Sequence, residues 1–144
     1  MPNPVVNKAS TEWTGELFTG SGTTTLETSG TATFDVAWKS RGEEGGGTTT
    51  PEELIAAAHA TCFAMQFSNV LKENGTPPAQ LSTSSAVTFV AGTGITGIEL
   101  TVRGTVEGID ASTFDELARK AKETCPVSQA LAATEITLAD VQLA

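Results

Sequence analysis

The sequence predicts an α+β fold of order βββ-α-ββ-αα-β, in which antiparallel strands pack around a long buried central helix. Two observations carry this prediction. Segments with alternating apolar residues come in consecutive runs and not as repeating strand–helix–strand units. Between two such runs lies one long apolar segment, residues 50–72, that opens with helix-capping residues. We expect a single domain over residues 1–144, because domains cluster near about 100–150 residues.

Three strands are expected before the long helix. Residues 31–38 (TATFDVAW) alternate cleanly, with every second residue from Ala32 on one apolar face. Residues 11–19 form an imperfect strand with a break at Gly15, and residues 22–28 are Thr-rich, as exposed β-ribbons often are. Turns containing Gly separate these segments, so the prediction is a three-stranded antiparallel meander.

The long helix has the clearest start signal in the chain. Thr50 can cap its N-terminus, Pro51 suits the first helical position, and Glu53 completes a capping box. Residues 54–71 are apolar nearly all round, which predicts a helix buried on most sides. Before it, residues 42–49 include four Gly and predict a loop that is mobile or shaped around a ligand.

The second half of the chain continues the α+β pattern. Residues 79–91 and 95–107 alternate and predict a long hairpin. Asp110 can cap the N-terminus of a second helix. Two helices and a final strand are expected: residues 111–124, 127–132 and 135–143.

Charge and hydropathy limit the possible partners. With 8 Lys and Arg against 17 Asp and Glu, the net charge is −9. Nucleic acid and anionic membrane surfaces attract basic proteins, so neither is an expected partner. No apolar run approaches the roughly 20 residues of a membrane span. The N-terminus lacks a signal-peptide pattern, and we therefore expect a cytoplasmic protein.

The two cysteines leave two interpretations open. Cys62, in the middle of the long helix, is either a small buried hydrophobe or a reactive thiolate that needs a nearby cation. Cys125, at a helix end, is either an unrelated buried thiol or a resolving thiol that condenses with an oxidised Cys62. A zinc site built from both cysteines, His59 and a carboxylate lacks any recognised spacing, so no metal or other cofactor is expected.

Three further residues could contribute chemistry. Arg41, beside the Gly-rich loop, is either a solvated cation or a group that lowers the Cys62 pKa, with Glu52 fixing its guanidinium. His59 lies one helical turn before Cys62. It is either a packing or dimer-contact residue or half of a Cys–His pair for thiol hydrolysis.

Two motifs resemble known sequences. The segment TTPEELIAAAHATCFAM, residues 49–65, resembles the signature helix of the OsmC/Ohr family. A second match runs through GIDASTF at residues 108–114 and CPVSQAL at residues 125–131. The order of elements agrees along nearly the whole chain. The branch is OsmC, because the Ohr branch usually has an aromatic residue in place of His59 and an Arg earlier than Arg41.

The resemblance implies a homodimer of intertwined chains and a thiol-dependent peroxidase that prefers organic hydroperoxides and serves in oxidative and osmotic stress defence. Cys62 is then the peroxidatic cysteine and Cys125 the resolving one, with recycling by an external dithiol such as a lipoyl-linked one. Arg41 and Glu52 match the family's charged residues, and Lys39 is a rival cation beside Arg41. No metal or flavin is implied. The alternative is a family member that senses redox state or binds a small molecule without turnover.

The residues around Cys62 also bear on the substrate. Phe63, Met65 and Phe67 follow it closely in the sequence. These apolar side chains predict a preference for alkyl hydroperoxides over hydrogen peroxide.

Overall fold

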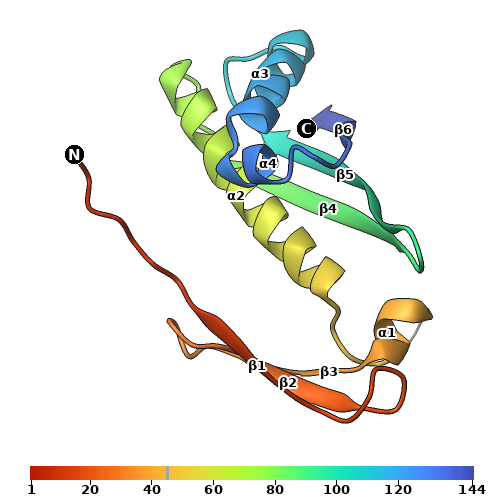
Figure 1. Ribbon diagram of the computed structural model, residues 1–144. Helices are drawn as coiled ribbons and strands as arrows, with labels where there is room; N and C mark the ends of the chain where they lie inside the picture. Colours follow the sequence, from red (N-terminus) through yellow and green to blue (C-terminus); the bar gives the residue numbers. More distant parts are fainter. Residues whose placement is uncertain (45) are drawn as a thin grey trace. The chain divides into compact units, whose positions relative to one another are not determined.

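The structure is a computed structural model that describes residues 1–44 and 46–144. It contains two compact units, Met1–Pro51 and Glu52–Ala144. The α+β class is confirmed, and the elements follow the predicted order except for one additional short helix (Figure 1). The assignment of residues 1–144 to one domain stays a prediction.

The first unit holds the predicted meander. Strands β1 (Ala9–Thr14), β2 (Ser21–Leu26) and β3 (Thr33–Val36) form an antiparallel sheet in the order β1-β2-β3. The first strand ends earlier than expected because Gly15 adopts a φ of 96°, a conformation that favours Gly. A turn follows, closed by a hydrogen bond of 2.8 Å from the Gly20 amide to the Glu16 carbonyl.

The helix α1 (Trp38–Gly42) was not predicted. The third strand was expected to continue to Trp38, but it stops at Val36. Trp38 instead opens a single helical turn and meets the ring of Phe18 edge-on, with centroids 5.7 Å apart. A five-residue helix has too few residues for a periodic signal, so the sequence could not indicate it.

The predicted Gly-rich loop, residues 42–49, is only partly described, because Gly45 lies outside the described residues. Gly42 belongs to α1 and not to the loop. Further on, the Thr48 amide donates to Ser40 Oγ over 3.0 Å, which ties the end of this segment back to α1.

The second unit contains a three-stranded sheet in the order β4-β5-β6. Strands β4 (Gln80–Val90) and β5 (Gly94–Thr105) form the predicted antiparallel hairpin. Strand β6 (Ile136–Leu143) pairs with β5 in parallel, so the expectation of antiparallel strands does not hold for this pair. Between β5 and β6 the chain runs through two helices, the kind of crossover connection that parallel strands need.

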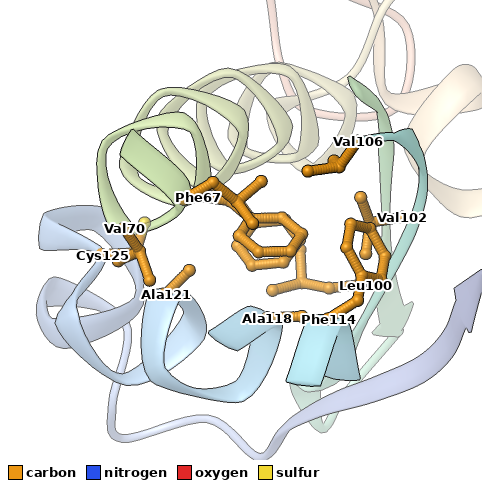
Figure 2. Packing of buried hydrophobic residues seen from close by; sticks show 11 residues of the cluster. Phe67, Val70, Leu100, Val102, Val106, Phe114, Ala118, Ala121 and Cys125 are labelled. Carbon is orange, nitrogen blue, oxygen red and sulfur yellow. The ribbon is translucent and has the colours of Figure 1, made fainter. Parts of the chain in front are cut away.

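The core of the second unit lies between two helices and β5. The long helix α2 (Pro51–Glu73) contributes Phe63 and Phe67, and α3 (Ala111–Thr124) contributes Phe114. The rings of Phe67 and Phe114 lie 5.0 Å apart between centroids (Figure 2). The predicted cap of α3 is confirmed, since Asp110 Oδ1 accepts from the Thr113 amide over 2.7 Å.

Within this single chain, α2 is buried on one face only. Phe63 and Phe67 are fully buried, whereas Met65 is 69% exposed. The prediction of a helix buried on most sides is therefore wrong for one chain. By length and composition α2 could cross a membrane, but its buried phenylalanines are typical of a core helix in a soluble fold.

Candidate functional site

The structure brings Cys62 and Cys125 together although they are far apart in the sequence. Cys62 lies in α2 and is partly exposed, whereas Cys125 is fully buried. Cys125 ends α3 and precedes the short helix α4 (Pro126–Ala130), so it stands at the bend between two helices. Both thiols are free, and they lie in hydrogen-bonding contact with each other.

Burial and two neighbouring groups set the pKa of the Cys62 thiol. Burial raises its pKa, and the contact with the Cys125 thiol raises it further. The backbone amide of Val127, in the first turn of α4, donates to the Cys62 sulfur and lowers its pKa. Burial dominates, so the net effect is a raised pKa. A reactive thiolate at Cys62 therefore needs a nearby positive charge in addition to the Val127 amide.

His59 is bound to a residue that the sequence did not single out. Its Nε2 lies 2.7 Å from Ser128 Oγ in α4, and the two side chains are 0% and 6% exposed. Burial lowers the pKa of His59, so the imidazole is neutral near pH 7. Ser128 lies inside the second family motif, CPVSQAL, but a helical Ser carries no signal of its own.

The His59 geometry does not form a Cys–His pair. Among the described residues, the other ring nitrogen of His59, Nδ1, has no hydrogen-bond partner. A thiol hydrolase needs its base hydrogen-bonded to the nucleophile. The ring instead binds Ser128, which favours a role in packing or positioning.

The charged candidates fall in both units. Arg41 and Lys39 lie in α1 of the first unit. Glu52 lies in the first turn of α2 in the second unit and is only 6% exposed. A carboxylate that is nearly buried normally has a charged or donating partner. The assignment of Arg41 and Glu52 to the site stays a prediction.

Of the three apolar residues that follow Cys62 in the sequence, two are part of the core. Phe63 and Phe67 are fully buried in the core of the second unit. Only Met65 is exposed. The two phenylalanines lie on the opposite side of α2 from Met65, and the preference for alkyl hydroperoxides stays a prediction.

The fold does not assemble the possible metal site from the described residues. Among residues 1–44 and 46–144, no group of three or more His, Cys, Asp or Glu side chains is arranged to hold a metal ion. His59 binds Ser128, and the Cys62 thiol contacts Cys125 and the Val127 amide.

The chain is similar to known proteins along most of its length. A family model described as OsmC-like protein matches residues 43–139. Peroxiredoxin OsmC of Escherichia coli strain K12 is 45% identical over 141 residues, covering 94% of this chain and 95% of that protein. An organic hydroperoxide resistance protein of Xanthomonas axonopodis pv. citri is 34% identical over 90 residues, covering 62% of this chain and 63% of that protein.

Solved structures share the fold. An organic hydroperoxide resistance protein from Elizabethkingia anophelis has a TM-score of 0.73 and 22% identity, with all of both chains covered. An organic hydroperoxide resistance protein OsmC from Legionella pneumophila has a TM-score of 0.67 and 24% identity, covering 96% of this chain and 99% of that one. At these identities the similarity supports the architecture alone.

Proposed function

This chain belongs to the OsmC family, and from that premise we propose that it is a cysteine-dependent peroxidase that reduces organic hydroperoxides to alcohols in peroxide defence. The observation that carries the proposal is the contact between the Cys62 and Cys125 thiols. Relatives named peroxiredoxin and organic hydroperoxide resistance protein support the reaction class.

The first step oxidises Cys62. Its thiolate attacks the hydroperoxide oxygen that bears the hydrogen, so a sulfur–oxygen bond forms and the oxygen–oxygen bond breaks. The alkoxide leaves and takes a proton, giving the alcohol. Cys62 is left as a sulfenic acid, two electrons more oxidised than the thiol.

The second step closes a disulfide. The Cys125 thiolate attacks the Cys62 sulfur, the sulfur–oxygen bond breaks, and the oxygen leaves as water after gaining a proton. The packing of Cys62 against the cluster that contains Cys125, with the two thiols acting on each other, supports this step. An external dithiol, such as a lipoyl-linked one, then reduces the disulfide by two exchange reactions and becomes oxidised itself.

Arg41 and Glu52 complete the proposed site. Cys62 alone has a raised pKa, and an arginine close to it would favour the thiolate and hold the peroxide. Glu52 would fix the guanidinium by a bidentate contact, and its burial supports pairing with a cation. Lys39, in the same short helix as Arg41, is the alternative cation.

We place the enzyme in the cytoplasm as a homodimer. The face of α2 that carries Ala58, Thr61 and Met65 is exposed in the single chain. Covering this face with a second copy would bury the apolar residues that one chain leaves in water. Met65 would then line the substrate site, which supports alkyl hydroperoxides over hydrogen peroxide.

The decisive experiment is steady-state turnover of cumene hydroperoxide with dihydrolipoamide as reductant. We expect sustained turnover by the wild type, none by Cys62→Ser, and a single oxidation without turnover by Cys125→Ser. Arg41→Ala should lower the rate at least about tenfold if it activates the thiol, with Lys39→Ala as its matched control.

Two results would contradict the proposal. One stoichiometric oxidation of the wild type without turnover, with both dihydrolipoamide and dithiothreitol, would indicate a redox sensor. Equal or faster turnover of hydrogen peroxide would remove the preference for organic substrates.

A further inference from the structure

The short helix α4 lies against α2 through contacts made by consecutive residues. The amide of Val127 donates to the Cys62 sulfur, and the next residue, Ser128, binds His59 over 2.7 Å. Cys125, immediately before α4, contacts the Cys62 thiol. His59 and Cys62 are about one helical turn apart and so lie on the same face of α2. This face therefore meets Cys125, Val127 and Ser128.

Helix α4 has little stability of its own. It is five residues long, and Cys125 at its N-cap makes no side-chain capping hydrogen bond. Helices this short do not persist in water without tertiary contacts. The position of the Val127 amide and the Cys125 thiol therefore depends on what holds α4 to α2.

Burying His59 for packing alone is energetically unfavourable. It is fully buried, and only one of its two ring nitrogens has a hydrogen-bond partner among the described residues. A buried polar atom without a partner is destabilising, so an apolar residue would fill this place at lower cost. What His59 provides and an apolar side chain cannot is the bond to Ser128.

We propose that the His59–Ser128 hydrogen bond is the positioning contact that holds the Val127 amide and the Cys125 thiol against Cys62. His59 and Ser128 are positioning residues, since neither touches the sulfurs through the contacts described. The role in turnover rests on the proposed peroxidase function, whereas the effect on the Cys62 thiol does not.

The bond has a chemical consequence once Cys62 is a sulfenic acid. Closure by Cys125 competes with a second hydroperoxide molecule, which transfers an oxygen to the same sulfur and leaves as alcohol, giving the sulfinic acid. Closure gives the disulfide and water. A held α4 favours closure, because small displacements of reacting atoms slow a reaction strongly.

The test compares Ser128→Ala with the wild type by two measurements. The first is the pH dependence of Cys62 alkylation by iodoacetamide, followed at that site by peptide mass spectrometry. It needs no peroxide. Without the His59 bond the Val127 amide and the Cys125 thiol are both displaced, and the amide has a larger effect on the Cys62 pKa than the hydrogen bond with Cys125. We therefore expect Cys62 to be alkylated about two- to threefold more slowly at pH 7.

The second measurement is the ratio of sulfinic acid to disulfide after a titration with cumene hydroperoxide, read from intact mass. We expect this ratio to rise about tenfold in Ser128→Ala. Ser128→Thr keeps the hydroxyl and should restore both values. The matched control is Thr83→Val, which removes a hydrogen bond of 2.8 Å from β4 to the Ala60 carbonyl on the same turn of α2.

A second variant is needed because Ser128→Ala could misfold. It leaves the buried imidazole of His59 without the hydrogen bond to Ser128. The double variant His59→Leu/Ser128→Ala removes both polar groups and should fold, since replacing both partners of a buried bond by apolar groups is nearly neutral. It should show the same slow alkylation and the same excess of sulfinic acid.

Wild-type values in the folded double variant would overturn the proposal, and so would an equal change in Thr83→Val. A wild type that forms no disulfide with cumene hydroperoxide would overturn the peroxidase proposal. The alkylation rates would still decide whether His59 and Ser128 position α4.

Discussion

The Cys62 thiol shows how neighbouring atoms set reactivity at the scale of one residue. Its pKa is raised by burial and by Cys125, and lowered by the Val127 amide. The Val127 amide therefore opposes burial and Cys125. The contribution of Cys125 can be removed by substitution. The thiolate, which is the attacking form in the proposed reaction, is the minor form of Cys62 at neutral pH unless a nearby cation favours it.

Removing Cys125 should make Cys62 more acidic. Cys125→Ala deletes a contact that raises the Cys62 pKa, so the thiolate forms at lower pH and iodoacetamide alkylation at pH 7 should rise about two- to threefold. Below the lowered pKa the gain is constant, and it disappears at high pH where both proteins are ionised.

The pH profile of alkylation measures this shift directly. Gln66→Ala is the control, because it removes a contact of 2.8 Å between α2 and Thr124 without altering either sulfur. An unchanged or higher midpoint in Cys125→Ala would mean that the Cys125 thiol does not act on Cys62.

The site could be predicted only in part from the sequence. Cys62 and Cys125 were singled out as candidates by residue type and position, but their pairing came from the family resemblance. The partner of His59 was missed, because Ser128 is an ordinary helix residue until the fold places it against α2. Contacts between distant segments depend on packing, which local patterns do not encode.

At the scale of elements, the strand β5 has a position where only Gly fits. A Cβ at Gly104 would lie 2.7 Å from Cζ of Phe114 and 2.9 Å from Cδ2 of Leu81. The Phe114 ring is fully buried in the core and cannot move aside easily. The absence of a side chain is what allows α3 to lie this close to the sheet.

Gly104→Ala should therefore destabilise the fold by about 1–3 kcal/mol, as overpacking of a dense core does. Urea unfolding followed by circular dichroism measures the change. The matched control is Gly97→Ala in the same strand, where the nearest atom to an added Cβ is the Glu135 carbonyl oxygen at 4.0 Å. An equal loss of stability in both variants would indicate that β5 tolerates Ala poorly in place of Gly at any position, and not that Gly104→Ala clashes with Phe114.

The elements with strong local signals were predicted well. The capping residues at Thr50 and Asp110 marked the starts of α2 and α3, and alternation marked the β4–β5 hairpin. The missed element was α1, and the missed pairing was the parallel alignment of β6 with β5. Whether two strands pair in parallel depends on the path of the chain that connects them. The residues of the strand itself do not indicate this path.

At the scale of the whole molecule, the exposed face of α2 predicts association. Met65 is 69% exposed although its side chain is apolar, and exposed Ala58 lies on the same face. Placing a charge on this face should weaken the proposed dimer, because burial of an unpaired charge is costly.

Met65→Lys should lower the dimer's affinity at least about tenfold, measured by sedimentation over a range of protein concentrations. Val90→Lys is the control, since it places the same charge on another exposed apolar residue outside α2. A wild type that sediments as a monomer at all concentrations would contradict the dimer, and an unchanged Met65→Lys would place its interface elsewhere. The sequence indicated an apolar helix, but a sequence without its partner cannot indicate which face a second chain covers.

The two units also differ in their optical properties. Trp13 and Trp38 are the only tryptophans of the chain, which has no Tyr, and both lie in the first unit. Both cysteines lie in the second. Intrinsic fluorescence therefore reports on the first unit, while the proposed redox chemistry involves cysteines of the second. A change of emission on oxidation of Cys62 would be a label-free signal passed from one unit to the other.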